Sequence, residues 1–423
     1  MATKRKSSPA GKAGQQGSAP SVRIRMYRVG FGDCFLVTLK GVHHILVDCG
    51  VHNKGNIKVN GDSLIDKAFE NIEQVTNKKL DIVIATHAHQ DHVSGFGKFV
   101  EGFESFDINE VWLPWTDDLS NPTAKKWHAK KKALVSLLLN HLNANLDARA
   151  VAAAENAGAN PVAMTALRHG FGKAKVRYLK ANDELDAPAG LTGFSAKILG
   201  PPLDQSFIAK MDPPGSDHYL RMAAAVGVAD KLDPFPGLGL SEADRATLAK
   251  DWLHLDAGLL EHIADQAKFP ARAVAFSLDK LLNNTSIVAL FTWAGKHLFF
   301  PGDAQYGDWI SWYKGSGSSI LSDISFYKVA HHGSWNATPR GAVEEMPEGD
   351  FAAMMSTQSV PWASIPRPAL AEALDKRTGG AMVRSDSLPV MGAPSGPKLG
   401  PLPRSFVAGD SSAGEHWIDY NIS

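Results

Sequence analysis

The sequence predicts an α/β fold in which buried strands alternate with amphipathic helices. The run at 81–85, Asp-Ile-Val-Ile-Ala, is short and rich in β-branched residues, which is typical of a buried strand. Residues 63–74 precede it with apolar side chains at helical spacing. The same sequence of a strand followed by metal-ligand residue types recurs at 297–303 and 326–332. Because open α/β sheets bind ligands at the carboxyl ends of their strands, we expect these three ends to form one site.

The fold begins with three predicted strands, at 22–29, 34–39 and 44–50. Glycines separate them, so an antiparallel meander is expected. The third strand ends in Asp48, whose carboxylate needs hydrogen bonds because it follows an apolar run. We expect Asp48 to orient a ligand histidine or its loop, and a simple turn cap is the alternative.

Three histidines and an aspartate occupy six residues, 87–92, directly after the strand at 81–85. His87 and His89 are expected to point the same way, because side chains of an extended segment alternate. Asp91 and His92 follow on the turn and can reach a second point. Imidazole nitrogens and carboxylate oxygens bind Zn²⁺, Mn²⁺ or Fe²⁺ in hydrolytic sites. One such histidine would be a surface residue, whereas this spacing predicts a metal site.

Residues 116–275 are less regular and predict an insertion or lid. Helices are expected at 124–146, near Val151, and at 241–264, where a Ser-x-x-Asp cap begins the helix. Short strands are expected at 177–179 and 195–199.

The helix expected at 124–146 begins with a cluster of lysines. These are Lys125, Lys126, Lys130, Lys131 and Lys132. A solvated helix face is the more common explanation of such a cluster, and contact with substrate phosphates is the alternative.

The second half returns to strands at 287–291, 297–300 and 326–330, followed by a strand at 352–356, a helix at 367–377 and closing strands at 404–407 and 416–422. Asp303 follows one of these strands and is suited to bridge two metals. His331 directly follows another strand, so we expect it to be a ligand. His332 is then expected to face the substrate or support the ligands.

Composition limits the remaining possibilities. Lysine plus arginine equals aspartate plus glutamate at 44 each, so no global charge indicates a nucleic-acid or membrane partner. The two cysteines, Cys34 and Cys49, exclude a disulfide scaffold and suit a reducing, cytoplasmic setting. No apolar run approaches the roughly 20 residues that span a bilayer. Residues 1–20 are expected to form a disordered basic tail without a signal peptide, before one domain at 21–423.

Five blocks of sequence, in order, resemble the metallo-β-lactamase-fold hydrolases, most closely the hydrolase domain of the DNA-uptake protein ComEC and its soluble relatives. The blocks are Val29–Cys34, Ile45–Gly50, Asn283–Val288, Pro301–Ala304 and Lys328–Ser334, and His87–His92 resembles the His-x-His-x-Asp-His signature of the wider fold. The resemblance covers about residues 22 to 390, except much of 116–275. It implies a four-layer αββα sandwich with the site at one edge, between two sheets.

The resemblance also implies two divalent metal ions, Zn²⁺ or Mn²⁺. Carried over residue by residue, the ligands would be His87 and His89 for the first metal, Asp91, His92 and His331 for the second, and Asp303 as the bridge. A hydroxide bridging the metals would attack phosphorus or a carbonyl carbon. Asp91 would orient that water, and His332, or Gly333 with Ser334, would stabilise the developing charge.

Two departures from the family pattern matter. Wider relatives supply another histidine before the strand at 287–291, where this chain has Asn283 and Asn284, as the ComEC branch does. The first site is therefore expected to bind weakly or to favour Mn²⁺. Relatives in the branch often have His-Pro before the late helix, where this chain has Ile365-Pro366, and no membrane channel is present.

The sequence therefore predicts a binuclear metal-dependent hydrolase, most plainly a phosphodiesterase or nuclease acting on nucleic acid or nucleotides. Hydrolysis of a lactone, thioester or β-lactam is the alternative enzyme activity. A regulatory module that has kept the fold without turnover is the third hypothesis. Substrate specificity is expected to depend on residues 116–275.

Overall fold

The computed structural model describes residues 21–59, 61–144, 148–158, 160–210, 212–213, 271–313, 318–386, 402–403, 405–409 and 416–423. The tail expected at 1–20 and the helix expected at 241–264 lie outside these described residues.

The first sheet contains the opening strands and, among the described residues, has eight strands in the order β16-β17-β1-β2-β3-β6-β7-β8. Their bounds in chain order are β1 Val22–Tyr27, β2 Cys34–Leu39, β3 His43–Cys49, β6 Lys79–Ile84, β7 Asp107–Pro114, β8 Lys175–Leu179, β16 Phe406–Ala408 and β17 Trp417–Ile422. Strands β1, β2 and β3 pair antiparallel, which confirms the expected meander, and β3, β6, β7 and β8 run parallel.

The second sheet has seven strands among the described residues, in the order β15-β14-β13-β12-β11-β10-β9. Their bounds are β9 Glu184–Asp186, β10 Phe194–Gly200, β11 Val288–Trp293, β12 Lys296–Phe300, β13 Phe326–Lys328, β14 Ala352–Met355 and β15 Met382–Arg384. Strands β12 to β15 are parallel, so their carboxyl ends share one edge. A separate two-stranded ribbon joins β4 (Lys58–Val59) and β5 (Asp62–Ser63).

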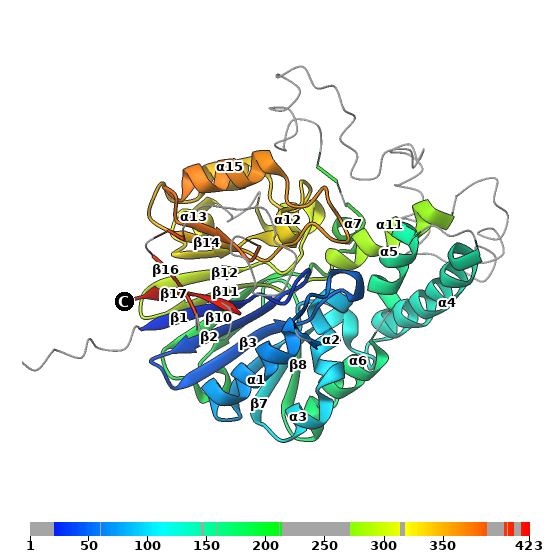
Figure 1. Cartoon of the computed structure of the whole chain (residues 1–423), viewed down its shortest axis with the longest axis horizontal. Coiled ribbons are helices and arrows are strands. Elements are labelled where there is room, and N and C mark those ends of the chain that lie inside the picture. Colours follow the sequence, from blue (N-terminus) through cyan, green and yellow to red (C-terminus); the bar gives the residue numbers. More distant parts are fainter. Residues whose placement is uncertain are drawn as a thin grey trace, which may run out of the picture.

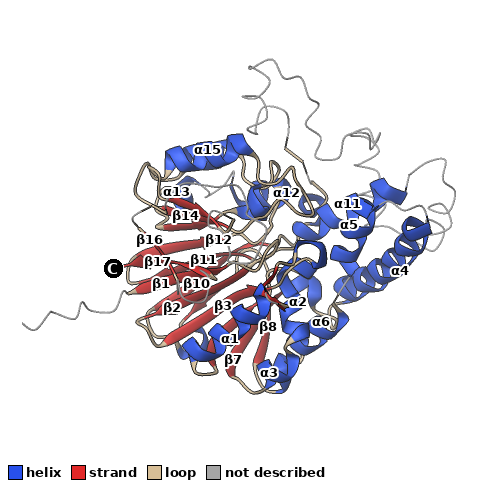
Figure 2. Ribbon diagram, viewed as in Figure 1, coloured by secondary structure: helices blue, strands red, loops and turns tan. Residues whose placement is uncertain are grey.

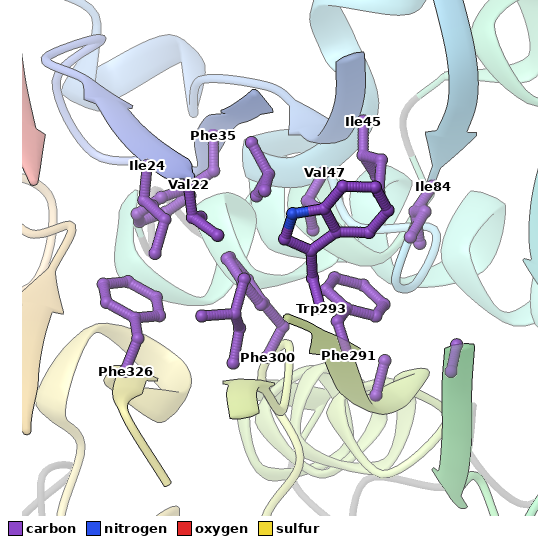
Figure 3. Close-up of a cluster of buried hydrophobic side chains, with 14 of the residues drawn as sticks. Val22, Ile24, Phe35, Ile45, Val47, Ile84, Phe291, Trp293, Phe300 and Phe326 are labelled. Carbon is purple, nitrogen blue, oxygen red and sulfur yellow. The ribbon is translucent and has the colours of Figure 1, made fainter. Parts of the chain in front are cut away.

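A continuous apolar core joins the two sheets face to face. Ile24, Phe35 and Val47 point from the first sheet towards Phe291 and Phe300 of the second (Figure 3). These side chains are all at most 3% exposed. Alternation along each strand places one set of apolar residues in this core and the opposite set under the outer helices.

Helices cover both outer faces (Figures 1 and 2). The first sheet packs against α1 Leu64–Thr76, α2 Gln90–Lys98, α3 Val100–Glu104 and α6 Pro161–Arg168. The second packs against α12 Tyr306–Trp312, α13 Ser318–Leu321, α14 Arg340–Glu345 and α15 Pro368–Arg377. Two sheets with helices outside confirm the predicted α/β class and its αββα layering.

Three further helices gather beside the sandwich, at the right of Figure 1: α4 (Pro122–Ala144), α5 (Ala148–Gly158) and α11 (Ala271–Asn283). Leu134 and Leu138 of α4 share an apolar cluster with Leu278 of α11. The same cluster includes Phe31 and Trp362 from the sandwich, which anchors the helices there.

The segment expected to be an insertion, 116–275, is only partly separate from the sandwich. Its strands β8 and β10 are members of the two sheets, and α6 covers the first sheet. Among the described residues of this segment, the helical pair α4 and α5 packs beside the sandwich. The remaining short elements are α7 Gln205–Ile208, η1 Asn53–Gly55, η2 Trp115–Asp117, η3 Gly170–Gly172, η4 Pro188–Gly190 and η6 Ala330–Gly333.

Cys34 and Cys49 are both buried free thiols, and they face each other across β2 and β3. Among the described residues, no helix combines the length and apolar character needed to cross a bilayer.

Candidate metal centre

The loop after β6 brings the 87–92 cluster to the edge between the sheets. His89 is the N-cap of α2, so Asp91 and His92 lie in the first turn of that helix. A helix N-terminus favours the negative charge of Asp91. Gly50 passes so close to this turn that a Cβ there would lie 2.4 Å from the backbone nitrogen of His92. Only glycine permits this approach of β3 to the loop.

Asp48 holds the loop in place. Its carboxylate accepts hydrogen bonds from the Thr86 backbone N–H and the Thr86 hydroxyl, both at 2.7 Å, and contacts His92 Nδ1 at 2.8 Å. With Nδ1 fixed in this way, Nε2 of His92 is directed towards the second sheet, where it meets Asp303. The carboxylate thus orients both the loop and one imidazole, in the manner of an outer partner of a metal ligand.

The second sheet supplies Asp303 after β12 and the two histidines of η6 after β13. Gly302 has φ of 56°, and a Cβ there would lie 2.9 Å from that of Thr86, so the two loops touch. His331 and His332 also adopt left-handed backbone conformations, with φ of 45° and 52°. Such conformations are costly for residues other than glycine and concentrate at functional sites.

Four side chains from the two sheets converge at one point. His92 Nε2 lies 3.1 Å from Asp303 Oδ2, and His332 Nε2 lies 3.2 Å from Asp303 Oδ2 and 3.1 Å from Asp91 Oδ2. One ligand atom from each of the four residues fits within 4.8 Å of all the others. Each residue is at most 2% exposed.

This donor set fits a divalent transition-metal ion. His92 Nε2 and Asp91 Oδ1 are buried at the point of convergence, and neither atom forms a hydrogen bond. Two imidazoles with two carboxylates match the preferences of Zn²⁺ and Mn²⁺. Burying a polar atom without a partner costs free energy, and a bound cation would remove this cost by giving the atom a partner.

His87 and His89 lie next to this group and contact each other. Nε2 of His87 lies 2.9 Å from Nδ1 of His89, and the His87 and His92 ring centroids are 4.2 Å apart. The alternation expected from the sequence therefore places both rings on one side of the loop. They remain the proposed ligands of a first metal, beside the four-residue group.

The paired histidines are placed in the opposite order from the one expected. His332, not His331, joins Asp91 and Asp303. The His331 ring lies between Asn283, at 3.3 Å from its Nε2, and Gln305, at 3.4 Å from its Nδ1. The expectation rested on His331 directly following the strand, but left-handed backbone conformations at both residues place the ring of His332 at the centre.

Lys328 and Asp33 are two members of the site that the sequence analysis did not assign. Lys328 Nζ forms an ion pair with Asp33 and lies 3.0 Å from Asp303 Oδ1. Lys328 is 2% exposed within a strand of apolar residues. A lysine is almost never fully buried without a partner, so its position in the predicted strand was the available signal.

The site divides its histidines into two charge states. Burial holds the pKa of His87 well below its usual value, and lowers the pKa of His89 to about 3 and that of His331 to about 4, so their rings are neutral. Burial acts the same way on His332, but Asp303 and Asp33 raise its pKa to about 10. Asp303 likewise raises the pKa of His92. Metal binding at the four-residue group would displace these protons.

A cleft opens over the centre, between the sandwich and the group of helices α4, α5 and α11. The centre contributes His89, Asp91 and Asp303 to its lining. The opposite side contributes Asn156 of α5 and Asp279 of α11, neither of which the sequence analysis assigned. Burial and the charge of Asp91 raise the pKa of Asp279 to about 8.

The other predicted site residues take different roles. Asn283 contacts His331 and lines the cleft. Asn284 donates to the carbonyls of Ile208 and Lys210, so it fixes the loop after α7. Ser334 lines the cleft, but its backbone N–H bonds to the His331 carbonyl and its hydroxyl donates to Asn336.

Comparison with known proteins agrees with this geometry. The family model described as the metallo-beta-lactamase superfamily matches residues 27–104, the part that runs from β1 to α3 and carries the 87–92 cluster. Over these residues the chain is similar to that superfamily. Asp303 and His332 lie outside the matched segment, and the structure supplies them.

The solved structures that match include the metallo-beta-lactamase fold protein YhfI from Bacillus subtilis. It is 10% identical, with a TM-score of 0.35, over 88% of this chain and 98% of that chain. No curated protein matches the sequence significantly.

Proposed function

We propose that the protein is a metal-dependent phosphodiesterase or nuclease. The observation that carries the proposal is the convergence of Asp91, His92, Asp303 and His332, with unpaired donor atoms, next to a cleft. Asp91 and Asp303 line that cleft, so a substrate seated there would lie against the ligand set.

When bound, divalent cations would supply a nucleophilic water at neutral pH and stabilise charge on the substrate. Asp91, Asp303, His92 and His332 would hold one ion, and His87 with His89 the other. Asp91 lines the cleft and its Oδ1 forms no hydrogen bond, so this carboxylate can orient the attacking water. His331 lines the cleft with a neutral ring at neutral pH, and can donate a hydrogen bond to a substrate oxygen.

The rest of the cleft favours a phosphodiester with attached rings. Lys280, Asn283 and Asn336 line it and carry N–H donors suited to phosphate oxygens. Trp335 and Trp362 line it as well, and indole rings stack on nucleobases for roughly 1–3 kcal/mol per base.

A second, smaller pocket lies behind the same loop. Ala88, between the two histidines, lines it together with His128 and Lys131 of α4. The lysine cluster expected from the sequence is therefore divided. Lys125, Lys126 and Lys132 are exposed, while Lys131 is half-buried and lines the pocket. Of these four, Lys131 is the one that lines a pocket beside the metal-binding loop, so it is our candidate for contact with a substrate phosphate.

We expect Lys131→Gln to raise the KM for a dinucleotide or longer substrate about tenfold, because a charge-assisted hydrogen bond contributes roughly 1.5–3 kcal/mol. The matched control replaces exposed Lys125, Lys126 and Lys132 with Gln and should leave dinucleotide kinetics unchanged. Steady-state kinetics at two salt concentrations measure both. An unchanged KM in Lys131→Gln would remove α4 from the substrate site.

The function itself is tested by metal analysis and a substrate screen. The purified chain should contain a divalent metal and should hydrolyse bis(p-nitrophenyl) phosphate with Mn²⁺ or Zn²⁺. Chelation should abolish this activity, and restored metal should return it. Hydrolysis of a lactone, thioester or β-lactam without phosphodiesterase activity would support the alternative enzyme. Bound metal without turnover of any of these substrates would support a regulatory module.

Two further proposals, the branch of the family and the cellular location, rest on the sequence. The ordered blocks support a place near the ComEC-type hydrolase domains, and the balanced charge with two buried thiols supports a cytoplasmic protein. Both remain proposals.

A further inference from the structure

Asp279 faces the centre from α11, a helix of the group that packs beside the sandwich. It lies on α11 and is 8% exposed. Its Oδ1 is 3.6 Å from Nε2 of His89, too far for a hydrogen bond. Nε2 of His89 is buried and has no hydrogen-bond partner. Both residues line the cleft, so two electron-pair donors flank the same space.

Asn156 fixes Asp279 with respect to the metal-binding loop. Its side-chain N–H donates to Asp279 Oδ1 at 3.1 Å, and its Oδ1 accepts from the Asp91 backbone N–H at 3.4 Å. One amide therefore joins α11 to the first turn of α2. Ligand carboxylates are commonly held by such hydrogen bonds from outside the coordination sphere.

The charges around Asp279 favour a cation. Asp91 and Asp303 both act on it electrostatically. The charge of the neighbouring Lys280 also acts on Asp279, but its ammonium group forms its hydrogen bond with Asp212, at 3.0 Å. Among the described residues, no lysine or arginine forms an ion pair with Asp279. A buried carboxylate in this position needs a positive partner or a proton.

We propose that Asp279 is itself a metal ligand and, with His89, holds a divalent cation on the helical side of the cleft. The proposal rests on the metal centre of the proposed function and extends it. It makes α11 part of the coordination sphere, so the helical group completes the site as well as covering it.

The test is metal stoichiometry and affinity, measured with Mn²⁺ by elemental analysis and titration. Asp279→Asn preserves shape and removes the charge. We expect it to lose one metal equivalent, or to weaken one by more than about 100-fold, beyond the ~10–100-fold effect of losing an outer partner. Asp308→Asn is the matched control, because Asp308 is also fully buried but has only burial acting on its pKa. It should bind metal as the wild type does.

Asp279→His distinguishes a ligand from a residue that merely orients His89. A histidine can replace the carboxylate as a ligand, so metal binding should return. In the Co²⁺-loaded protein the visible absorption should also shift, because nitrogen replaces oxygen. Circular dichroism checks that each variant is folded. Wild-type stoichiometry and affinity in Asp279→Asn would overturn this inference alone, whereas a wild-type chain that binds no Mn²⁺ would overturn the proposed function as well.

Discussion

Asp303→Ala is expected to be inactive and to lose bound metal. Asp303 contacts His92 and His332 through one oxygen and Lys328 through the other, so it joins the donors of both sheets. Removal of one preorganised charge at a reacting centre costs about 10²–10³-fold in rate, and the loss of metal would add to this. Elemental analysis and phosphodiester hydrolysis measure the two effects.

The free energy of unfolding of Asp303→Ala provides a second measurement. Removing one partner of a buried ion pair costs roughly 3–5 kcal/mol. The cost here should fall at the lower end, because Lys328 keeps its ion pair with Asp33. Asp303→Asn should unfold nearer the wild-type temperature while remaining inactive. The exposed Asp323 provides the control, and Asp323→Asn should behave as the wild type. An active, metal-loaded Asp303→Ala protein would contradict the site.

The paired histidines should separate metal binding from turnover. His332→Ala is expected to lose metal, because its Nε2 lies 3.1 Å from Asp91 and 3.2 Å from Asp303. His331→Ala should keep metal and lose roughly 10–100-fold in kcat, because a hydrogen bond to a charged group contributes roughly 1.5–3 kcal/mol. Alanine retains the left-handed strain that histidine has at these positions, so the pair of variants differs mainly in the lost ring.

Metal content and kcat of the two variants decide the order. Loss of metal in His331→Ala with retention in His332→Ala would restore the order expected from the sequence. His331→Gly and His332→Gly serve as companions that relieve the backbone strain, and they should lose the same functions without loss of stability.

The sequence predicts the sandwich well because its signals are local. Apolar strands at 81–85 and 297–300 and the helix at 63–74 follow from periodicity alone, and each appears in the structure within a few residues. The 87–92 cluster also needs no tertiary information, because its ligand types lie within one turn. Asp48 was identified because a carboxylate at the end of an apolar strand requires partners.

Other features depend on contacts that spacing does not encode. Which of His331 and His332 faces the centre follows from two consecutive residues in left-handed conformations. The residue types at these positions do not indicate such conformations. Asp279 comes to the centre through the packing of α11 against α4 and α5, helices with no motif of their own. The short strands expected at 177–179 and 195–199 appear as β8 and β10, but the sheet that each one joins depends on strands distant in sequence.

The core between the sheets has a consequence for the chemistry. Asp91 and His92 follow a strand of the first sheet, whereas Asp303 and His332 follow strands of the second. Side chains such as Phe35 and Phe300 set the thickness of the apolar layer between the sheets. This thickness therefore sets the distance between the two halves of the centre. A shift of about 1 Å at a reacting centre can cost 100-fold in rate. Phenylalanines that never contact the substrate therefore help to set the positions of the ligand atoms. A change in core packing that shifts one sheet relative to the other would change the rate of the reaction.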